Sequence, residues 1–127
     1  MDILIRYGFS IEEIKDMMDT NQDLESINDN DVLELINILI DVGCHEEHIM
    51  NIFTCNPLLL SRDITQIKKL IKKLKNLKFK KIYMLLDSNP YLLNMNEDEL
   101  EKEYNDRLDQ GLSHEEVIDY FYHNTVI

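Results

Sequence analysis

The amino-acid sequence predicts an all-α protein, a right-handed or curved α-solenoid that forms a single domain over residues 1–127. Composition is the first reason. The 127 residues include only three glycines and two prolines, and leucine, isoleucine, glutamate and lysine are abundant, which favours helices joined by short turns. The second reason is an internal repeat, and the third is the helical spacing of apolar residues within each copy of that repeat.

The repeat becomes visible when four stretches of sequence are set in one frame. The copies begin at Gly8, Gly43, Asn76 and Gly111, and they align without a gap. Glycine and asparagine tolerate the left-handed backbone that often ends a helix, so each copy is expected to begin where a helix stops. The aligned segments are GFSIEEIKDMMDTNQDLES, GCHEEHIMNIFTCNPLLLS, NLKFKKIYMLLDSNPYLLN and GLSHEEVIDYFYHNTVI.

The first helix of each repeat is predicted from apolar columns that are spaced as one helix face. A column of asparagine follows them, and Pro57 and Pro90 come next in the two middle copies, so each first helix should end there. The apolar columns are Ile14, Ile49, Ile82, Val117, then Met17, Ile52, Leu85, Tyr120, then Met18, Phe53, Leu86, Phe121; the asparagines are Asn21, Asn56, Asn89 and Asn124.

A second amphipathic helix is predicted between successive copies, over roughly residues 30–42, 63–75 and 96–110. Each repeat is thus a helix, a short turn of the NPxLL type and another helix. Such a unit cannot bury its own apolar stripe and must stack on its neighbours, which gives a solenoid of about three and a half repeats. The residues expected to point inward are Val32, Leu35, Ile36, Leu39, Ile64, Ile67, Leu70, Ile71, Leu74, Leu100, Tyr104 and Leu108.

The second copy holds both cysteines and two of the four histidines, which raises the question of a metal site. The repeat alignment gives each of the four a structural place instead. Cys44 falls in an apolar column, His45 at a helix N-terminus, His48 at a solvent-facing position and Cys55 at a helix C-terminus. The spacing also lacks a paired CxxC pattern. We therefore expect no metal and no cofactor.

The sequence carries no motif that would make it an enzyme. It contains no glycine-rich phosphate loop, no GxSxG, no HExxH and no spaced aspartate loop for calcium. The acidic run at residues 96–103 is best interpreted as a charged helix start, because acidic side chains are favoured near a helix N-terminus. We expect no catalytic residues and no small-molecule substrate.

The N-terminal segment indicates where the protein is expected to reside. It has neither the basic and then apolar pattern of a secretory signal nor the arginine-rich, acid-poor pattern of a mitochondrial presequence. No apolar run reaches the ~18 residues of a membrane span. The sequence therefore predicts a cytoplasmic protein that does not bind a membrane, with two free thiols.

The charge of the chain is strongly polarised. The formal net charge is −12, from 25 acidic and 13 basic residues. Residues 62–81 hold nine of the basic residues and one acidic residue, Asp63, for a local charge of +8, which leaves −20 on the rest of the chain. The basic residues of this segment are Arg62, Lys68, Lys69, Lys72, Lys73, Lys75, Lys78, Lys80 and Lys81.

The frame G-Φ-S-x-E-E-Φ, followed after two apolar residues by NPxLLS, resembles the repeats of the mitochondrial transcription termination factor (mTERF) family. The resemblance rests on residues 8–14, 56–61, 89–93 and 111–117 and extends over nearly the whole chain. It implies a curved solenoid of two α-helices and a short 3-10 turn per repeat, with nucleic-acid binding along a basic groove. It also implies a role in organelle transcription or ribosome biogenesis. The chain departs from the family in being short, acidic and without a targeting presequence, and its isoleucine-, asparagine- and lysine-rich composition would suit a bacterial member.

Two functions are compatible with these observations. The first is a protein-interaction scaffold, because the flanks are acidic and because ILIRYG near the start repeats as ILIDVG at residues 38–43, so that both ends look cut within a repeat. Its partner would be an unknown protein or a second copy bound through open solenoid ends. The alternative is nucleic-acid binding, with Phe79 and Tyr83 as aromatic residues nearby. The candidate nucleic-acid-binding residues are Lys68, Lys69, Lys72, Lys73, Lys75, Lys78, Lys80 and Lys81.

Overall fold

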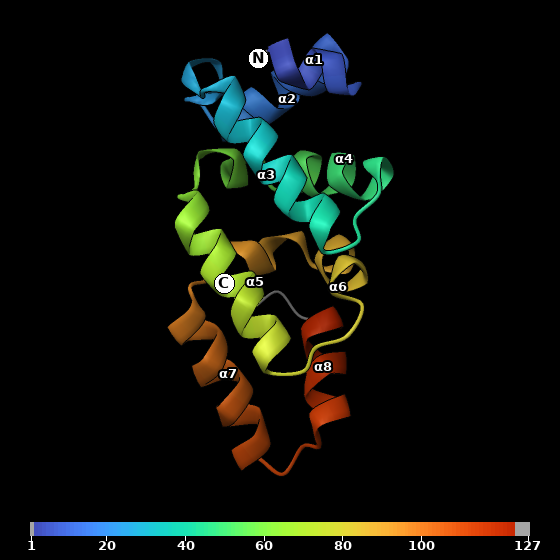
Figure 1. Cartoon of the computed structure of the whole chain (residues 1–127), viewed down its shortest axis with the longest axis vertical. Coiled ribbons are helices and arrows are strands. Elements are labelled where there is room, and N and C mark those ends of the chain that lie inside the picture. Colours follow the sequence, from blue (N-terminus) through green and yellow to red (C-terminus); the bar gives the residue numbers. More distant parts are fainter. Residues whose placement is uncertain (1, 124–127) are drawn as a thin grey trace.

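The computed structural model describes residues 2–123, and over that range the chain is entirely helical, as the sequence predicts (Figure 1). Successive helix pairs stack along the long axis of the molecule, with the N-terminal pair at one end. Within residues 2–123, no helix is long and apolar enough to cross a membrane.

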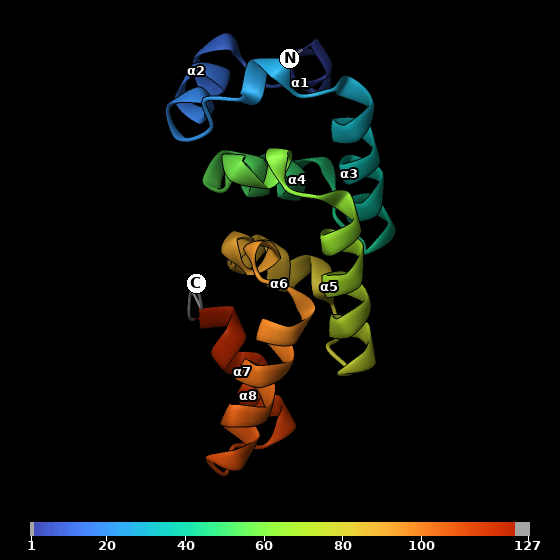
Figure 2. The same cartoon turned by 90° about the vertical axis from the view of Figure 1, so that its left-hand side faces the viewer.

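The helices form two rows that lie side by side (Figure 2). In one row α1 contacts α3, α3 contacts α5 and α5 contacts α7, while in the other α2 contacts α4, α4 contacts α6 and α6 contacts α8. The apolar stripe of each helix is therefore covered by its own partner and by the neighbouring repeat. The first row is α1 (Asp2–Tyr7), α3 (Asp29–Asp41), α5 (Ile64–Asn76) and α7 (Glu97–Asp109); the second is α2 (Ile11–Thr20), α4 (Glu46–Cys55), α6 (Ile82–Ser88) and α8 (His114–His123).

A 3-10 turn links the two helices of each of the first three repeats. The turns are η1 (Leu24–Ser26), η2 (Pro57–Ser61) and η3 (Pro90–Asn94). Each proline occupies the first position of its turn, where its missing N–H leaves no hydrogen bond unmade. The predicted end of the first helix at the NPxLL motif is confirmed.

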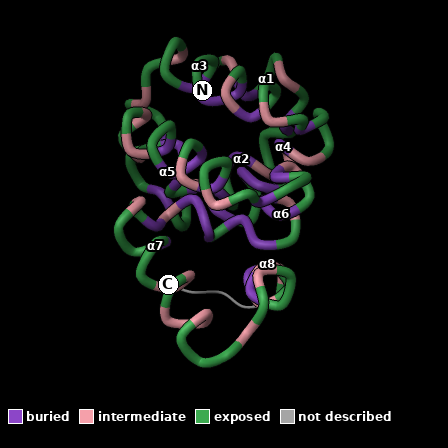
Figure 3. The backbone as a smooth tube through the Cα atoms, turned by 60° about the horizontal axis from the view of Figure 1, so that its bottom comes forward, coloured by how far each residue is buried: buried purple, intermediate pink, exposed green. Residues whose placement is uncertain are grey.

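The core lies between the two rows, and Figure 3 shows buried segments gathered inside with exposed segments around them. Most of the residues predicted to point inward are buried, including every one predicted for α3. Ile64, Tyr104 and Leu108 are only half-buried. The last two lie on α7, which packs against α5 and α8 but is the last first-row helix within residues 2–123, so no further helix of that row covers it.

The third junction between repeats differs from the ungapped alignment. A left-handed residue ends the second helix at Gly8 (φ 125°), Gly43 (φ 105°) and Gly111 (φ 94°), and at the third junction this residue is Lys78 (φ 67°) rather than Asn76. Asn76 is instead the last residue of α5. The repeat boundary therefore falls two residues later than the sequence alignment places it.

Hydrogen bonds at the junctions support this register. The N–H of the residue after the left-handed position donates to a carbonyl five residues earlier, from Phe9 to Leu4 at 3.0 Å and from Phe79 to Leu74 at 3.0 Å. Phe79 is buried, whereas Leu77, which the alignment put in the apolar column, is half-buried. The helices before the two junctions, α3 and α5, have 13 residues each, whereas the helix after the third junction is shorter, with 7 residues in α6 where α4 has 10.

The asparagine column joins each repeat to the next. All three described members are almost fully buried, and each donates from its side-chain Nδ2 to a backbone carbonyl in the following repeat. The bonds run from Asn21 to Pro57 at 3.0 Å, from Asn56 to Pro90 at 3.1 Å and from Asn89 to Phe121 at 3.0 Å. Asn124, the fourth member of the column, lies outside the described residues.

Candidate nucleic-acid interface

Helix α5 presents its lysines because its apolar residues fix which face is inward. Ile67, Leu70, Ile71 and Leu74 are buried, so the intervening positions point away from the core. The helix begins where the side chain of Asp63 accepts a hydrogen bond from the N–H of Thr65 at 2.9 Å. Lysines in its last turn are favoured by the partial negative charge of the helix C-terminus.

Two of the eight candidate lysines pair with carboxylates on α3 and α7, the neighbours of α5 in its own row. Lys68 Nζ lies 2.9 Å from Glu34 of α3, and Lys73 Nζ lies 3.2 Å from Glu101 of α7. These ion pairs connect three successive helices of one row. Because their charges are already balanced locally, Lys68 and Lys73 are the weakest candidates for binding a phosphate.

The other six candidates are exposed and form no ion pair with any residue in the described range 2–123. They occupy the outer side of α5 and the loop of residues 77–81 that leads to α6. We call this set the basic patch. Its members are Lys69, Lys72, Lys75, Lys78, Lys80 and Lys81.

The loop of the basic patch has a fixed backbone because an aromatic cluster anchors it. The ring of Phe79 lies 5.7 Å from that of Phe121, 6.1 Å from that of Tyr104 and 6.3 Å from that of His114, measured between centroids. His114 Nε2 also lies 3.2 Å from the carbonyl oxygen of Lys78. The buried phenylalanine thus holds the loop against α7 and α8 while the lysines on either side of it stay in solvent.

The two aromatic residues that the sequence places near the lysines differ in accessibility. Phe79 is a core residue at 5% exposure and cannot stack on a base. Tyr83 is half-buried and lines a cavity together with Lys75 and Lys81. The patch is therefore rich in charge and poor in aromatic surface, which suits contacts to phosphates more than to bases.

Arg62 belongs to the basic segment of the sequence but not to the patch. Its side chain is half-buried, and Nη2 donates to the carbonyl oxygen of Met95 at 2.7 Å. Arg62 and Met95 occupy equivalent places after η2 and η3, so this hydrogen bond ties one repeat to the next. Its role is structural.

The two cysteines and two histidines of the second repeat, for which the sequence raised the question of a metal site, have structural places in the fold. Cys44 is buried, and burial, with a smaller contribution from Asp87, raises the pKa of its thiol to about 11. Cys55 is exposed. His48 Nδ1 accepts a hydrogen bond from the backbone N–H of His45 at 2.9 Å at the start of α4. Across residues 2–123, no three His, Cys, Asp or Glu side chains form a group that could hold a metal ion.

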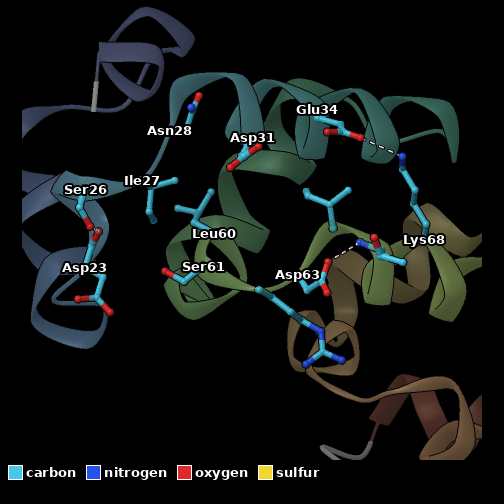
Figure 4. A pocket seen from close by; sticks show the side chains of 13 residues that line it. Asp23, Ser26, Ile27, Asn28, Asp31, Glu34, Leu60, Ser61, Asp63 and Lys68 are labelled. Carbon is cyan, nitrogen blue, oxygen red and sulfur yellow. Dashed lines mark hydrogen bonds and ion pairs between the residues drawn. The ribbon is translucent and has the colours of Figure 1, made fainter.

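A polar cavity of about 680 Å³ lies between the N-terminal parts of α3 and α5 (Figure 4). Much of its wall consists of groups that already have structural partners. Asp63 caps α5 through Thr65, and Glu34 is held by Lys68. The carboxylates that line it are Asp23, Asp31, Glu34 and Asp63. Two of them, Glu34 and Asp63, are therefore accounted for by pairing and capping, and the lysines of α5 remain the better candidate site.

A stack of two-helix repeats that carries a concentrated lysine patch defines a helical-repeat binding protein. The mTERF family model matches residues 1–123, and the chain belongs to the mTERF family. This is a helical-repeat family whose members typically bind nucleic acid. A search of curated proteins finds no significant match. The family assignment inferred from the repeat frame is confirmed.

Proposed function

We propose that this protein binds nucleic acid through its phosphate backbone, and that the basic patch is the contact surface. The observation that carries the proposal is the set of six exposed lysines without an ion-pair partner in the described part of the chain, on a molecule whose net charge is −12. Lysine side chains near phosphates release condensed counterions, which supplies most of the affinity in non-specific binding.

The negative charge of the rest of the chain limits this site but does not abolish it. At physiological salt the Debye length is about 8 Å, so acidic residues farther away than that are largely screened at the patch. At low salt the same acids act over longer distances and slow the approach of a polyanion. We therefore expect a short contact of a few nucleotides rather than a long wrapped path.

The backbone of the loop supports a functional role for its lysines. Lys78 and Lys81 adopt φ values of 67° and 51°, in the left-handed region that is unfavourable for residues with a side chain. The equivalent of Lys78 is glycine at the other three junctions. Strained positions of this kind often occur at functional sites. A lysine retained where glycine would be less strained is consistent with a need for its charge.

The test is a fluorescence-anisotropy titration with a labelled single-stranded RNA and a labelled DNA duplex at about 50 mM and about 200 mM salt. We expect micromolar or tighter binding at the lower salt. If about four duplex phosphates are neutralised, affinity should fall roughly 150-fold between the two salt concentrations. The double variant Lys78→Glu, Lys80→Glu should bind at least tenfold more weakly, because it places two negative charges in the loop.

The control must change the net charge equally at another site. Lys15→Glu, Lys102→Glu does so, since Lys15 is an exposed residue of α2 and Lys102 an exposed residue of α7. We expect this control to bind almost as well as the unmodified protein. Equal losses in both variants would mean that only total charge matters, and absence of binding at the lower salt would refute the proposal.

A second candidate function is protein binding, which one surface feature favours. A groove between α3 and α5 has an aliphatic floor and a lysine rim. A phosphate backbone would use the rim but leave the floor exposed to water. An apolar and acidic protein segment would use both.

A further inference from the structure

The groove between α3 and α5 has two chemically different parts. A cavity of about 280 Å³ is floored by Ile38, Val42 and Ile71. Ile38 and Val42 are half-buried, so their apolar surface is accessible from outside. The rim has three lysines of α5 and one carboxylate of α3, and its residues are Lys68, Lys72, Lys75 and Asp41.

The groove continues past the ends of both helices. A second cavity, of about 440 Å³, shares Asp41, Val42 and Lys75 with the first and extends to Tyr83 and Lys81 on the α6 side. We call the two together the α3–α5 groove. Along its whole length an apolar floor is bordered by more lysine than carboxylate, so the groove has a net positive rim.

The equivalent positions one repeat earlier carry no lysine. The positions of α3 that correspond to Lys68, Lys72 and Lys75 are occupied by uncharged residues, Leu33, Asn37 and Ile40. Leu33 and Ile40 are exposed at 44% and 50%. The basic rim of α5 is therefore absent from α3 and is not a general property of the repeat.

We propose that the α3–α5 groove is a docking site for an acidic amphipathic helix of a partner protein. This inference deepens the protein-binding candidate and rests on it. The partner must be acidic because Lys72 and Lys75 are exposed without an ion pair among residues 2–123. It must also be apolar on the same face, because burying Ile38 and Val42 against hydrocarbon is favourable whereas burying them against phosphate is not.

The spacing of the rim lysines indicates a helical partner. Lys68, Lys72 and Lys75 follow one another at i, i+4 and i+7 along α5, a row about 10 Å long in which Lys68 already pairs with Glu34 and the other two form no ion pair among residues 2–123. A helix laid beside α5 presents carboxylates at the same period, with apolar residues at the neighbouring positions that face the floor. Helix-in-groove recognition uses apolar anchors at this period.

The experiment uses the full chain and two fluorescently labelled synthetic peptides. One peptide is a helix with glutamates at i, i+4 and i+7 and leucines on the adjoining face; the other has the same composition in an order that spreads the leucines around the helix. In anisotropy titrations we expect the amphipathic peptide to bind at least tenfold more tightly than its scrambled partner. The bound surface is mapped by chemical-shift changes of backbone amides.

Two variants assign the binding to the rim and to the floor. Lys72→Glu, Lys75→Glu should weaken peptide binding at least tenfold, while the equally charged Lys15→Glu, Lys102→Glu should not. Ile38→Ala, Val42→Ala should weaken peptide binding at least fivefold and leave nucleic-acid binding unchanged, because it removes apolar surface without changing charge. Circular dichroism of each variant tests whether it is folded, and substitution of the exposed lysine pair carries little risk of unfolding.

The outcomes separate the groove from the broader function. Equal binding of both peptides would overturn the groove proposal but preserve protein binding through charge. Absence of binding by either peptide would overturn both. A dimer in sedimentation velocity whose contact maps to the groove would replace the foreign partner with a second copy of the chain and so overturn the proposal.

Discussion

The side chain of Asn56 at the end of α4 donates a hydrogen bond to the carbonyl oxygen of Pro90, the first residue of η3, at 3.1 Å. Its Nδ2 also lies 3.0 Å from Oδ1 of Asn94. Asn21 makes the same pair of bonds one repeat earlier, to Pro57 at 3.0 Å and to Oγ of Ser61 at 2.8 Å. A 3-10 turn has carbonyls left over from its own hydrogen bonding, and a buried amide from the preceding repeat satisfies them.

Replacing Asn56 with alanine should destabilise the protein by about 2–3 kcal/mol, because the buried carbonyl of Pro90 would lose its partner and Asn94 would lose another. Urea unfolding followed by circular dichroism measures this loss. Asn76→Ala is the matched control, since Asn76 is exposed at the end of α5 and should change the free energy of unfolding by less than about 0.5 kcal/mol. Similar values for the two variants would contradict the bridging role.

Two junction glycines should respond differently to the same substitution. Both have positive φ, at 105° for Gly43 and 94° for Gly111. A Cβ on Gly43 would lie 2.9 Å from Cδ1 of Tyr83, whereas a Cβ on Gly111 would meet nothing within 4 Å. Gly111→Ala should therefore cost about 1 kcal/mol from backbone strain alone, and Gly43→Ala about 1–2 kcal/mol more from the clash.

The two glycine variants control each other in thermal or urea unfolding, because they share the backbone strain and differ in the contact. Combining Gly43→Ala with Tyr83→Ala should recover part of the additional loss, since the shorter side chain leaves space for the new Cβ. Equal destabilisation by the two single variants would show that the contact with Tyr83 relaxes freely.

Features that depend on local chemistry could be predicted from the sequence. Helix interiors follow from apolar spacing, and serine at an N-cap follows from its ability to accept a backbone N–H. Ser10 Oγ accepts from Glu13 at 3.1 Å and Ser113 Oγ from Glu116 at 3.2 Å, as their column predicts. At the equivalent place in the second repeat, His48 takes the part of the glutamate by accepting from a backbone N–H.

Features that depend on how one repeat meets the next could not be predicted in the same way. The ungapped alignment matched the helix interiors but misplaced the third junction, because a lysine adopts the conformation that glycine adopts elsewhere. The pairing of Lys68 with Glu34 depends on the register between two stacked helices, which periodicity along one helix does not contain. The lysine cluster was visible in the sequence, but which lysines are already paired became visible only in the structure.

Lys78 should lower the stability of the protein through its left-handed backbone while its charge strengthens nucleic-acid binding. Lys78→Gly should stabilise the protein by about 0.5–1 kcal/mol, because glycine relieves the left-handed strain and loses part of that gain through greater freedom when unfolded. The same variant should bind nucleic acid more weakly, since one lysine of the basic patch is removed. Urea unfolding and anisotropy on one preparation measure both effects. Lys80→Gly is the control for lost charge; its stability should not rise. Unchanged stability in Lys78→Gly would show that the strain is negligible.

The two thiols should react at very different rates. Cys55 is exposed and should be modified readily by a thiol reagent at pH 8, while Cys44 is buried with a pKa raised to about 11 and should react only when the protein opens. In Cys55→Ser, one slowly reacting thiol should remain, and urea should accelerate its reaction. Rapid modification of both thiols in the native protein would contradict the buried position of Cys44.

The raised pKa of Cys44 also predicts a pH dependence of stability. A folded pKa above the unfolded one means that the protonated thiol stabilises the fold fully below about pH 9, and that this contribution is lost as pH rises towards 11. The free energy of unfolding of Cys44→Val should decline less than that of the unmodified protein between pH 8 and pH 11, by about 2–3 kcal/mol at most.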